Sequence, residues 1–172
     1  MPFLFETPRL RCRRWTATDF DAVYAIYSDP IAMRFVGEGK PISREACEKW
    51  FQVTETNYQT RGYGMFALED QASGLVIGCC GLTHPGGQAD VEIKYTFLRE
   101  RWGKGLASEV VPALLRYGWQ EHGLARVIAT VDPENTISQK TLAKAGASVV
   151  EHRLEEDGTT TLVFEWLAPG VA

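Results

Sequence analysis

A short glycine-rich turn between a strand and a helix constrains this chain more than any other feature. Residues 101–108 read Arg-Trp-Gly-Lys-Gly-Leu-Ala-Ser. Apolar residues alternate over residues 91–98 before the turn, which predicts a strand, and Leu106, Val110 and Leu114 after it share one face of a helix. The first amides of a helix have no partner within it and lie at the positive end of its dipole. Because glycines let an anion approach these amides closely, the turn is a candidate phosphate site.

Two well-known phosphate-binding motifs fit this turn poorly. A P-loop requires serine or threonine after Gly-Lys, whereas Gly105 follows Lys104 here. A dinucleotide-binding fingerprint requires a third glycine or alanine after the first strand, but Ser108 occupies that position after a later strand. The local sequence leaves two interpretations open, which are a tight strand-to-helix turn without a ligand and an anion site of another kind.

The hydrophobic patterns along the rest of the chain predict a mixed α/β sheet. Strands are expected at residues 10–15, 63–68, 75–82, 91–98, 126–131, 149–154 and 160–167, and helices at residues 18–29, 43–58, 105–123 and 136–144. The chain has 172 residues, with no internal repeat, low-complexity stretch or long linker. Residues 1–172 are therefore expected to form a single domain.

Composition argues against several classes of partner. The formal net charge of −4 disfavours a polyanion such as nucleic acid. No apolar run reaches the ~18 residues of a transmembrane helix, and the N-terminus lacks the apolar stretch of a secretory signal. The four cysteines and three histidines show no metal-ligand spacing, so no metal site is expected. Cysteines without a disulfide framework favour a reducing cytoplasm.

Four segments, taken in order along the chain, resemble one superfamily of acyltransferases. They are Thr7-Pro8-Arg9-Leu10-Arg11, Glu92-Ile93-Lys94-Tyr95, the turn residues Trp102, Gly103, Gly105, Ala107 and Glu109, and Asn135-Thr136-Ile137-Ser138 followed by Lys144-Ala145-Gly146. In these segments the chain resembles the GNAT superfamily, and within it the branch that acetylates the N-terminal alanine or serine of ribosomal proteins. The resemblance implies the GNAT-like acyl-CoA N-acyltransferase fold, with a twisted, mostly antiparallel central sheet and about four helices.

The resemblance also implies acetyl-CoA as the cofactor and a primary amine as the acceptor. The residues that would contact the cofactor are Tyr95, Trp102, Gly103, Lys104, Gly105, Ala107, Ser108 and Asn135. In this fold a backbone amide near Tyr95 faces the thioester carbonyl and stabilises the oxyanion. Asn135 would cap its helix and reach the pantetheine amides. The acceptor, a protein N-terminus or a small amine, would lie against residues 31–63 and 84–88.

Glu92 and Ser138 are the residues expected to move protons. A carboxylate near the reaction centre can take the proton of the acceptor ammonium, so Glu92 is the candidate general base. Ser138 is the candidate acid for the leaving thiolate, because the position at which many members have tyrosine is Leu142 here. The alternative for Glu92 is a polar residue on the solvent face of a strand, and for Ser138 a local bond to the helix backbone.

At Lys94 the sequence departs from the pattern of this branch, which usually has glycine at this position. In a regular strand Glu92 and Lys94 share a face, and the ammonium would make the carboxylate a poorer base. A bulge would instead turn Lys94 away. The departures at Lys94 and Leu142 support an alternative function, a non-catalytic acyl-CoA-binding module. A monomer and a homodimer are both compatible with the sequence.

Overall fold

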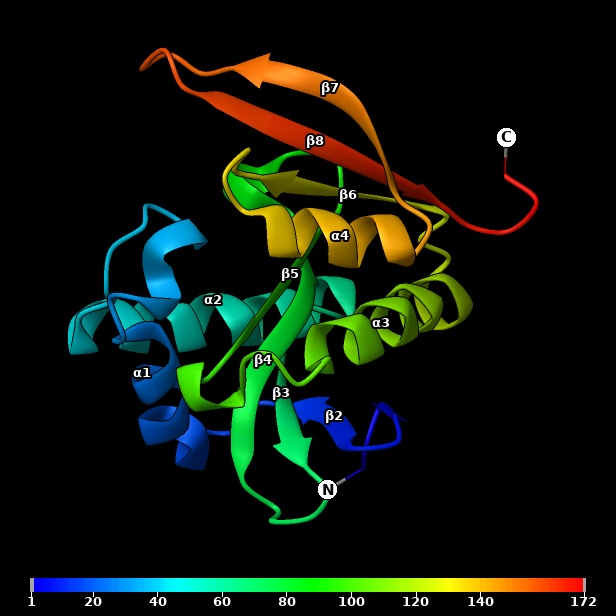
Figure 1. Ribbon diagram of the computed structural model, residues 1–172. Helices are drawn as coiled ribbons and strands as arrows, with labels where there is room; N and C mark the ends of the chain where they lie inside the picture. Colours follow the sequence, from blue (N-terminus) through cyan, green and yellow to red (C-terminus); the bar gives the residue numbers. More distant parts are fainter. Residues whose placement is uncertain (1, 172) are drawn as a thin grey trace.

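One mixed sheet of eight strands organises the structure, in the order β1-β2-β3-β4-β5-β6-β8-β7 (Figure 1). The computed structural model describes residues 2–171. The strands are β1 Phe5–Glu6, β2 Leu10–Arg14, β3 Met65–Asp70, β4 Val76–Thr83, β5 Glu92–Phe97, β6 Arg126–Val131, β7 Ser148–Leu154 and β8 Thr160–Leu167. Every neighbouring pair is antiparallel except β5 with β6, which confirms the expected mixed, mostly antiparallel sheet.

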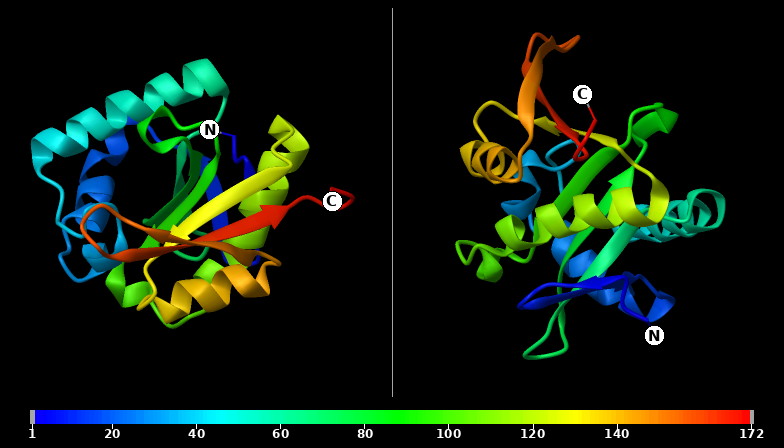
Figure 2. Two further views of the ribbon diagram at one scale, coloured as in Figure 1. Left: turned by 90° about the horizontal axis from the view of Figure 1, so that it is seen from above. Right: turned by 90° about the vertical axis from the view of Figure 1, so that its right-hand side faces the viewer.

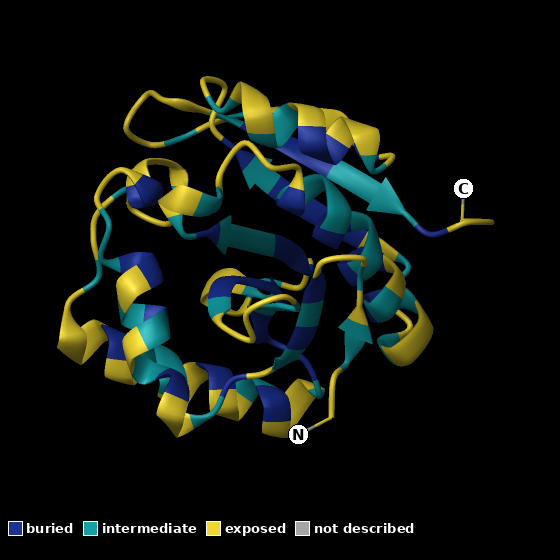
Figure 3. Cartoon of the chain, turned by 60° about the horizontal axis from the view of Figure 1, so that its bottom comes forward, coloured by how far each residue is buried: buried dark blue, intermediate teal, exposed yellow. Residues whose placement is uncertain are grey.

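Helices cover both faces of the central strands (Figure 2). They are α1 Phe20–Tyr27, α2 Arg44–Arg61, α3 Leu106–His122 and α4 Thr136–Lys144, with short 3-10 segments at Ala17–Asp19, Ala32–Phe35, Pro85–Gly87 and Arg99–Arg101. Cys79 of β4 packs in a cluster with α1 and α2, whereas its neighbour Cys80 packs in a larger cluster with α3. β4 therefore has an apolar core on each side, and Figure 3 shows buried residues along the central strands. No helix within residues 2–171 is long and apolar enough to cross a membrane.

Single residues of the sequence set the ends of three helices. α2 begins after Ser43, whose side chain accepts a hydrogen bond from the Ala46 amide at 3.1 Å. α4 begins after Asn135, whose side-chain oxygen accepts a hydrogen bond from the Ser138 amide at 3.2 Å. α3 ends at Gly123, whose φ of 67° is a left-handed conformation that glycine adopts without strain. Asn135 therefore has the capping position that the sequence predicted.

The parallel strands β5 and β6 separate soon after they meet. They pair at Glu92 and Ile128, and the Ile128 amide donates to the Val91 carbonyl at 2.9 Å. On its other side β5 pairs with β4 over its whole length. Beyond Glu92, β5 therefore presents a free edge of backbone amides and carbonyls to the opening between β5 and β6.

The structure differs from the sequence-based expectation in one additional strand and in where two other elements begin. The two-residue strand β1 was not expected, because two residues are too few to show alternation. The first helix begins at Phe20 and follows a 3-10 turn, in which Thr16 and Asp19 form a capping box. β3 begins at Met65 instead of Tyr63, and the Tyr63 hydroxyl bonds to His84 at 2.7 Å.

Candidate active site

The glycine-rich turn is exposed at the start of α3. Gly103 and Gly105 adopt left-handed backbone conformations, with φ of 73° and 76°. A Cβ added at Gly103 would meet no heavy atom within 4 Å beyond its chain neighbours, and one added at Gly105 would meet Arg9 at 3.7 Å. The Glu109 amide donates to the Gly105 carbonyl at 3.2 Å, so the earlier amides of the helix point toward the turn. The turn therefore has room and positive polarity for a negatively charged group.

A segment near the N-terminus is held against this turn through Glu109. The Glu109 carboxylate accepts hydrogen bonds from the Thr7 hydroxyl at 2.6 Å and the Arg9 amide at 2.7 Å, and it forms an ion pair of 2.8 Å with the Arg9 guanidinium. That guanidinium also donates to the Lys104 carbonyl at 2.8 Å. Burial alone would raise the pKa of Glu109, but the hydrogen bonds from Thr7 and Arg9 outweigh it and lower the pKa. Sequence reasoning missed Arg9 as a site residue, because its contact with Glu109 spans 100 positions.

The other residues of the turn that are expected to contact a cofactor lie near the start of α3 and the end of β5. Trp102 is 46% exposed, and its indole nitrogen donates to the Phe97 carbonyl at 3.0 Å, so the ring is tied to the end of β5. Lys104 is exposed, whereas Ala107 and Ser108 are half-buried in the first turn of α3. The structure therefore brings these residues together at the C-terminal end of β5.

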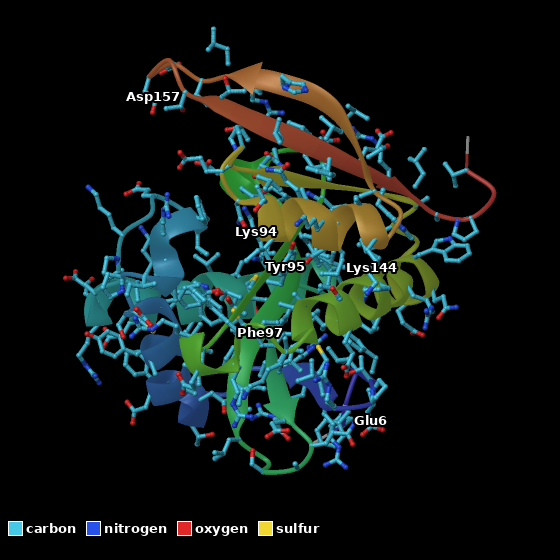
Figure 4. All side chains as sticks on the ribbon, in the orientation of Figure 1. Glu6, Lys94, Tyr95, Phe97, Lys144 and Asp157 are labelled. Carbon is cyan, nitrogen blue, oxygen red and sulfur yellow. The ribbon has the colours of Figure 1, made fainter. Side chains whose placement is uncertain are left out.

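Alternate residues of β5 face opposite layers of the molecule. Met65 of β3 and Lys94 lie in one row across β4, and Met65 belongs to the cluster around α1 and α2. Lys94 and Glu92 therefore face the layer of α1 and α2. Tyr95 faces the other layer and packs against the larger cluster. Figure 4 labels Lys94, Tyr95 and Phe97, which follow β5 through the centre of the molecule.

Glu92 and Lys94 form an ion pair on their shared face. Glu92 is only 3% exposed, and Thr130 of β6 donates a hydrogen bond to its Oε2 atom at 3.2 Å. The Lys94 ammonium contacts the same oxygen, while 39% of the lysine side chain stays exposed. β4 and β5 pair without a register shift, so the strand contains no bulge there that would turn Lys94 away. Glu92 is thus a buried carboxylate with its own counter-ion, not a residue on a solvent face.

Tyr95 and Ser138 meet on the opposite face of β5. Their hydroxyls share a hydrogen bond of 2.5 Å between β5 and the first turn of α4. Burial raises the pKa of Tyr95, and the bond to Ser138 lowers it in part. The Ser138 hydroxyl therefore contacts a second element instead of a local carbonyl. Leu142, which stands where many family members have tyrosine, is 2% exposed and packs in the core.

A cavity of about 380 Å³ lies between α2 and the loop that joins β4 to β5. It is lined by Trp50, Val53, Thr54, Asn57, Arg61, Met65, Thr83, His84, Pro85, Gly86 and Gly87. Hydrogen bonds to the Tyr63 hydroxyl at 2.7 Å and to the Gln88 carbonyl at 3.0 Å fix the His84 ring. Glu92 and Lys94 are not among these lining residues. Thr83 and Met65 of the lining lie in the same cross-strand rows as Glu92 and Lys94, so the cavity lies next to the pair along the sheet.

The four cysteines, Cys12, Cys47, Cys79 and Cys80, are buried and free. Burial raises the pKa of Cys79 to about 12, although a hydrogen bond of 2.9 Å with the Tyr27 hydroxyl opposes this effect. A buried thiol with a raised pKa is a poor nucleophile, so Cys79 is a packing residue.

Comparison with known protein families identifies the family of the chain. Residues 9–148 match the family described as the acetyltransferase (GNAT) domain. The chain therefore belongs to the GNAT family, and it is an acetyltransferase with the GNAT fold. The Bacillus subtilis (strain 168) protein named uncharacterized N-acetyltransferase YoaA is 30% identical over 161 residues, which cover 91% of this chain and 90% of the relative.

Solved structures share the fold over nearly the whole chain. A GNAT-family acetyltransferase from Bacillus anthracis is 25% identical, with a TM-score of 0.77 and coverage of 94% of this chain and 96% of that one. RimL, a ribosomal L7/L12 alpha-N-protein acetyltransferase in complex with coenzyme A, is 14% identical, with a TM-score of 0.83 and coverage of 99% and 100%. A spermidine N-acetyltransferase from Vibrio cholerae, in complex with CoA and spermine, is 18% identical, with a TM-score of 0.77 and coverage of 92% and 95%.

Proposed function

We propose that the protein is an acetyl-CoA-dependent N-acetyltransferase, in which a primary amine attacks the thioester directly. One observation carries this proposal, namely the set of groups around the opening between β5 and β6. An exposed turn with two left-handed glycines follows the end of β5, a buried carboxylate lies on one face of the strand, and two bonded hydroxyls lie on the other. Two structures with the same fold hold coenzyme A, which supports this choice of cofactor.

The residues present fit a pyrophosphate and a pantetheine arm. The open amides at the start of α3, with no Cβ at Gly103 or Gly105, would hold the pyrophosphate, and Arg9 and Lys104 add positive charge beside it. The free edge of β5 would bond the pantetheine amides in the manner of an added strand. When bound, the cofactor supplies the acetyl thioester, and Trp102 would border it at the end of β5.

Glu92 would accept the proton of the acceptor ammonium. Its carboxylate is buried and adjoins the cavity between α2 and the β4–β5 loop, where an amine would lie next to it. Loss of the proton leaves the nitrogen lone pair free to attack the thioester carbon. The backbone amide near Tyr95, on the free edge of β5, would donate to the oxygen that becomes negative.

Ser138 and Tyr95 would together protonate the thiolate that leaves. A serine hydroxyl alone is a very weak acid, but its hydrogen bond to Tyr95 lets the phenol replace the proton that Ser138 gives up. Burial raises the pKa of Tyr95, so the phenol holds its proton at neutral pH. In this proposal the pair takes the place of the helix tyrosine that Leu142 replaces.

The proposed acceptor is a peptide N-terminus or a small primary amine. By their names, the two structural neighbours act on the ribosomal protein L7/L12 and on spermidine, so the shared fold serves amines of both kinds. The four free, buried cysteines support a location in the reducing cytoplasm.

Calorimetric titration with acetyl-CoA, ATP and NAD tests the cofactor site. Gly105→Glu places a negative side chain at the turn, and it is expected to weaken acetyl-CoA binding at least about tenfold, or about 1.4 kcal/mol. Gly158→Glu is the matched control, because Gly158 also has a left-handed conformation, with φ of 85°, and lies beside Asp157 at the distant β7–β8 hairpin (Figure 4). Folded wild-type protein that prefers ATP or NAD, or that does not bind acetyl-CoA, would contradict the proposal.

A further inference from the structure

The acceptor side of the site contains two opposite charges in contact. Glu92 and Lys94 lie on the same face of β5, and their side chains form an ion pair beside the cavity. The side chain of Glu92 is 4% exposed and that of Lys94 is 39% exposed, so the ammonium is the more accessible member. Thr130 holds the carboxylate from β6 with its hydrogen bond of 3.2 Å. An acceptor that reaches Glu92 must therefore also meet the ammonium of Lys94.

The described walls of the cavity carry no negative charge that could pair with a second cation. None of the eleven described residues that line it is aspartate or glutamate. Arg61, in the last turn of α2, is exposed and carries the one formal charge among them, and it is positive. A polyamine has further ammonium groups besides the one that reacts, and this wall would repel them. The charges of the site therefore disfavour a polycation and favour an acceptor with one amine and one acid group.

Resting on the function proposed above, we propose that the acceptor is a free α-amino acid, whose ammonium binds Glu92 and whose carboxylate binds Lys94. An α-amino acid carries both charges on one carbon atom, so they are as close together as the charges of the Glu92–Lys94 pair. Each charge of the acceptor then replaces one half of the ion pair and makes a charge-assisted hydrogen bond. A protein N-terminus has an amide at this position and lacks the second charge.

The acceptor carboxylate also has a role in the reaction. When it binds the Lys94 ammonium, it replaces Glu92 as the partner of the lysine, and the Glu92 carboxylate is free to accept a proton. Glu92 then takes one proton from the acceptor ammonium, and the nitrogen lone pair forms a bond to the acetyl carbon. The bond between that carbon and sulfur breaks, and the thiolate receives a proton from Ser138. The nitrogen then gives up its second surplus proton, which replaces the one lost by the Ser138–Tyr95 pair, and Glu92 releases its proton to solvent. An acceptor without the carboxylate leaves Lys94 on Glu92, so its rate falls as well as its affinity.

Matched acceptors test this inference directly. Leucine, methionine and glutamate are each compared with their α-amides, and spermidine and an N-terminal alanine peptide are added, with thiol release and product mass as readouts. The wild-type enzyme is expected to favour at least one free amino acid over its own amide by at least about tenfold in kcat/KM, since one charged hydrogen bond is lost. In Lys94→Met that ratio of acid to amide is expected to fall to near one. Because the acid and its amide are compared within the same variant, any effect of Lys94→Met on Glu92 itself changes both rates and cancels in the ratio.

Two controls separate the possible results. Lys49→Met removes an exposed lysine of α2 outside the cavity lining and is expected to keep the wild-type ratio. Acetyl-CoA binding and thermal unfolding confirm that Lys94→Met is folded, and Lys94→Gln replaces it if it is not. Two results would overturn this inference and leave the acetyltransferase function standing. One is a kcat/KM for the amides, the peptide or spermidine that equals or exceeds that for every amino acid, and the other is an unchanged acid-to-amide ratio in the Lys94 variant. No product from any amine, with acetyl-CoA bound, would overturn both.

Discussion

At the residue scale, the proposed chemistry depends most on the contact between Lys94 and Glu92. A buried carboxylate without a partner would be costly, and the ammonium together with Thr130 supplies the partners. Lys94 thus allows the Glu92 carboxylate to lie charged in a place that is only 3% exposed. In the proposed reaction this contact breaks when the acceptor carboxylate binds Lys94, and Glu92 is then free to accept a proton.

The first prediction at this scale concerns a variant in which Glu92 has lost its charge. Glu92→Gln keeps the shape of the side chain and the bond from Thr130, but it cannot accept the acceptor proton. We expect kcat/KM to fall about 100-fold or more, with acetyl-CoA affinity unchanged because Glu92 faces the layer of α1 and α2. Steady-state thiol release and calorimetry measure both quantities. A variant that keeps wild-type turnover would exclude Glu92 as the base.

The Tyr95–Ser138 pair gives a second prediction. Ser138→Ala and Tyr95→Phe are each expected to lower kcat about 10- to 100-fold, and the double variant no further than the worse single one, because they act as one relay. Since burial raises the pKa of Tyr95 above its ordinary value of 10, the loss of its proton should not lower wild-type kcat below pH 10. The pH profile of kcat and the double-variant cycle check this. Losses that multiply would show that the two hydroxyls act independently.

At the scale of elements, the start of α3 depends on a segment about a hundred positions away in the chain. Thr7 and Arg9 precede β2 and hold Glu109 of α3 through three contacts of 2.6 to 2.8 Å. These contacts fix the helix start relative to the sheet and carry the Arg9 guanidinium to the turn. Glu109 therefore holds the helix start and Arg9 in place at the proposed cofactor site.

Glu109→Gln tests this support through stability. We expect the free energy of unfolding at neutral pH to fall by about 1–2 kcal/mol, because charge-assisted hydrogen bonds become neutral ones. The folded pKa of Glu109 lies below its ordinary value of 4.5, so the carboxylate contributes its stability above pH 4.5 and loses it as pH falls through the folded pKa.

The difference in stability between wild type and variant should therefore shrink as the pH falls below 4.5. Denaturant unfolding over this pH range measures it. Glu100→Gln, at an exposed residue of the 3-10 turn before α3, is the control and should leave stability unchanged. A difference between Glu109→Gln and wild type that stays constant with pH would contradict the assigned hydrogen bonds.

At the scale of the whole molecule, the sheet separates two halves of one site. The turn, Tyr95 and Ser138 lie on the side of α3 and α4, while Glu92, Lys94 and the cavity lie on the side of α1 and α2. The opening between β5 and β6 connects the two sides. In the proposed reaction the cofactor and the acceptor therefore approach from opposite faces of β5 and meet at this opening.

Local features of the site could be predicted from the sequence, whereas contacts between distant elements could not. The left-handed glycines and the Asn135 cap depend on neighbouring residues, so their patterns are visible in the chain itself. The Tyr95–Ser138 bond joins residues 43 positions apart and depends on how α4 packs over β5. Strand alternation allowed both a bulge and a regular strand at Lys94, and the pairing with β4 was needed to decide between them.

The most direct test of the central claim is to follow acetyl transfer itself. Purified protein is incubated with acetyl-CoA and the set of primary amines, and free coenzyme A thiol and acetylated amine are measured in the same samples. The account predicts one acetylated amine for each thiol released, with both signals reduced in Gly105→Glu and unchanged in Gly158→Glu. Thiol release without an acetylated amine, or tight acetyl-CoA binding with no product from any amine, would contradict it.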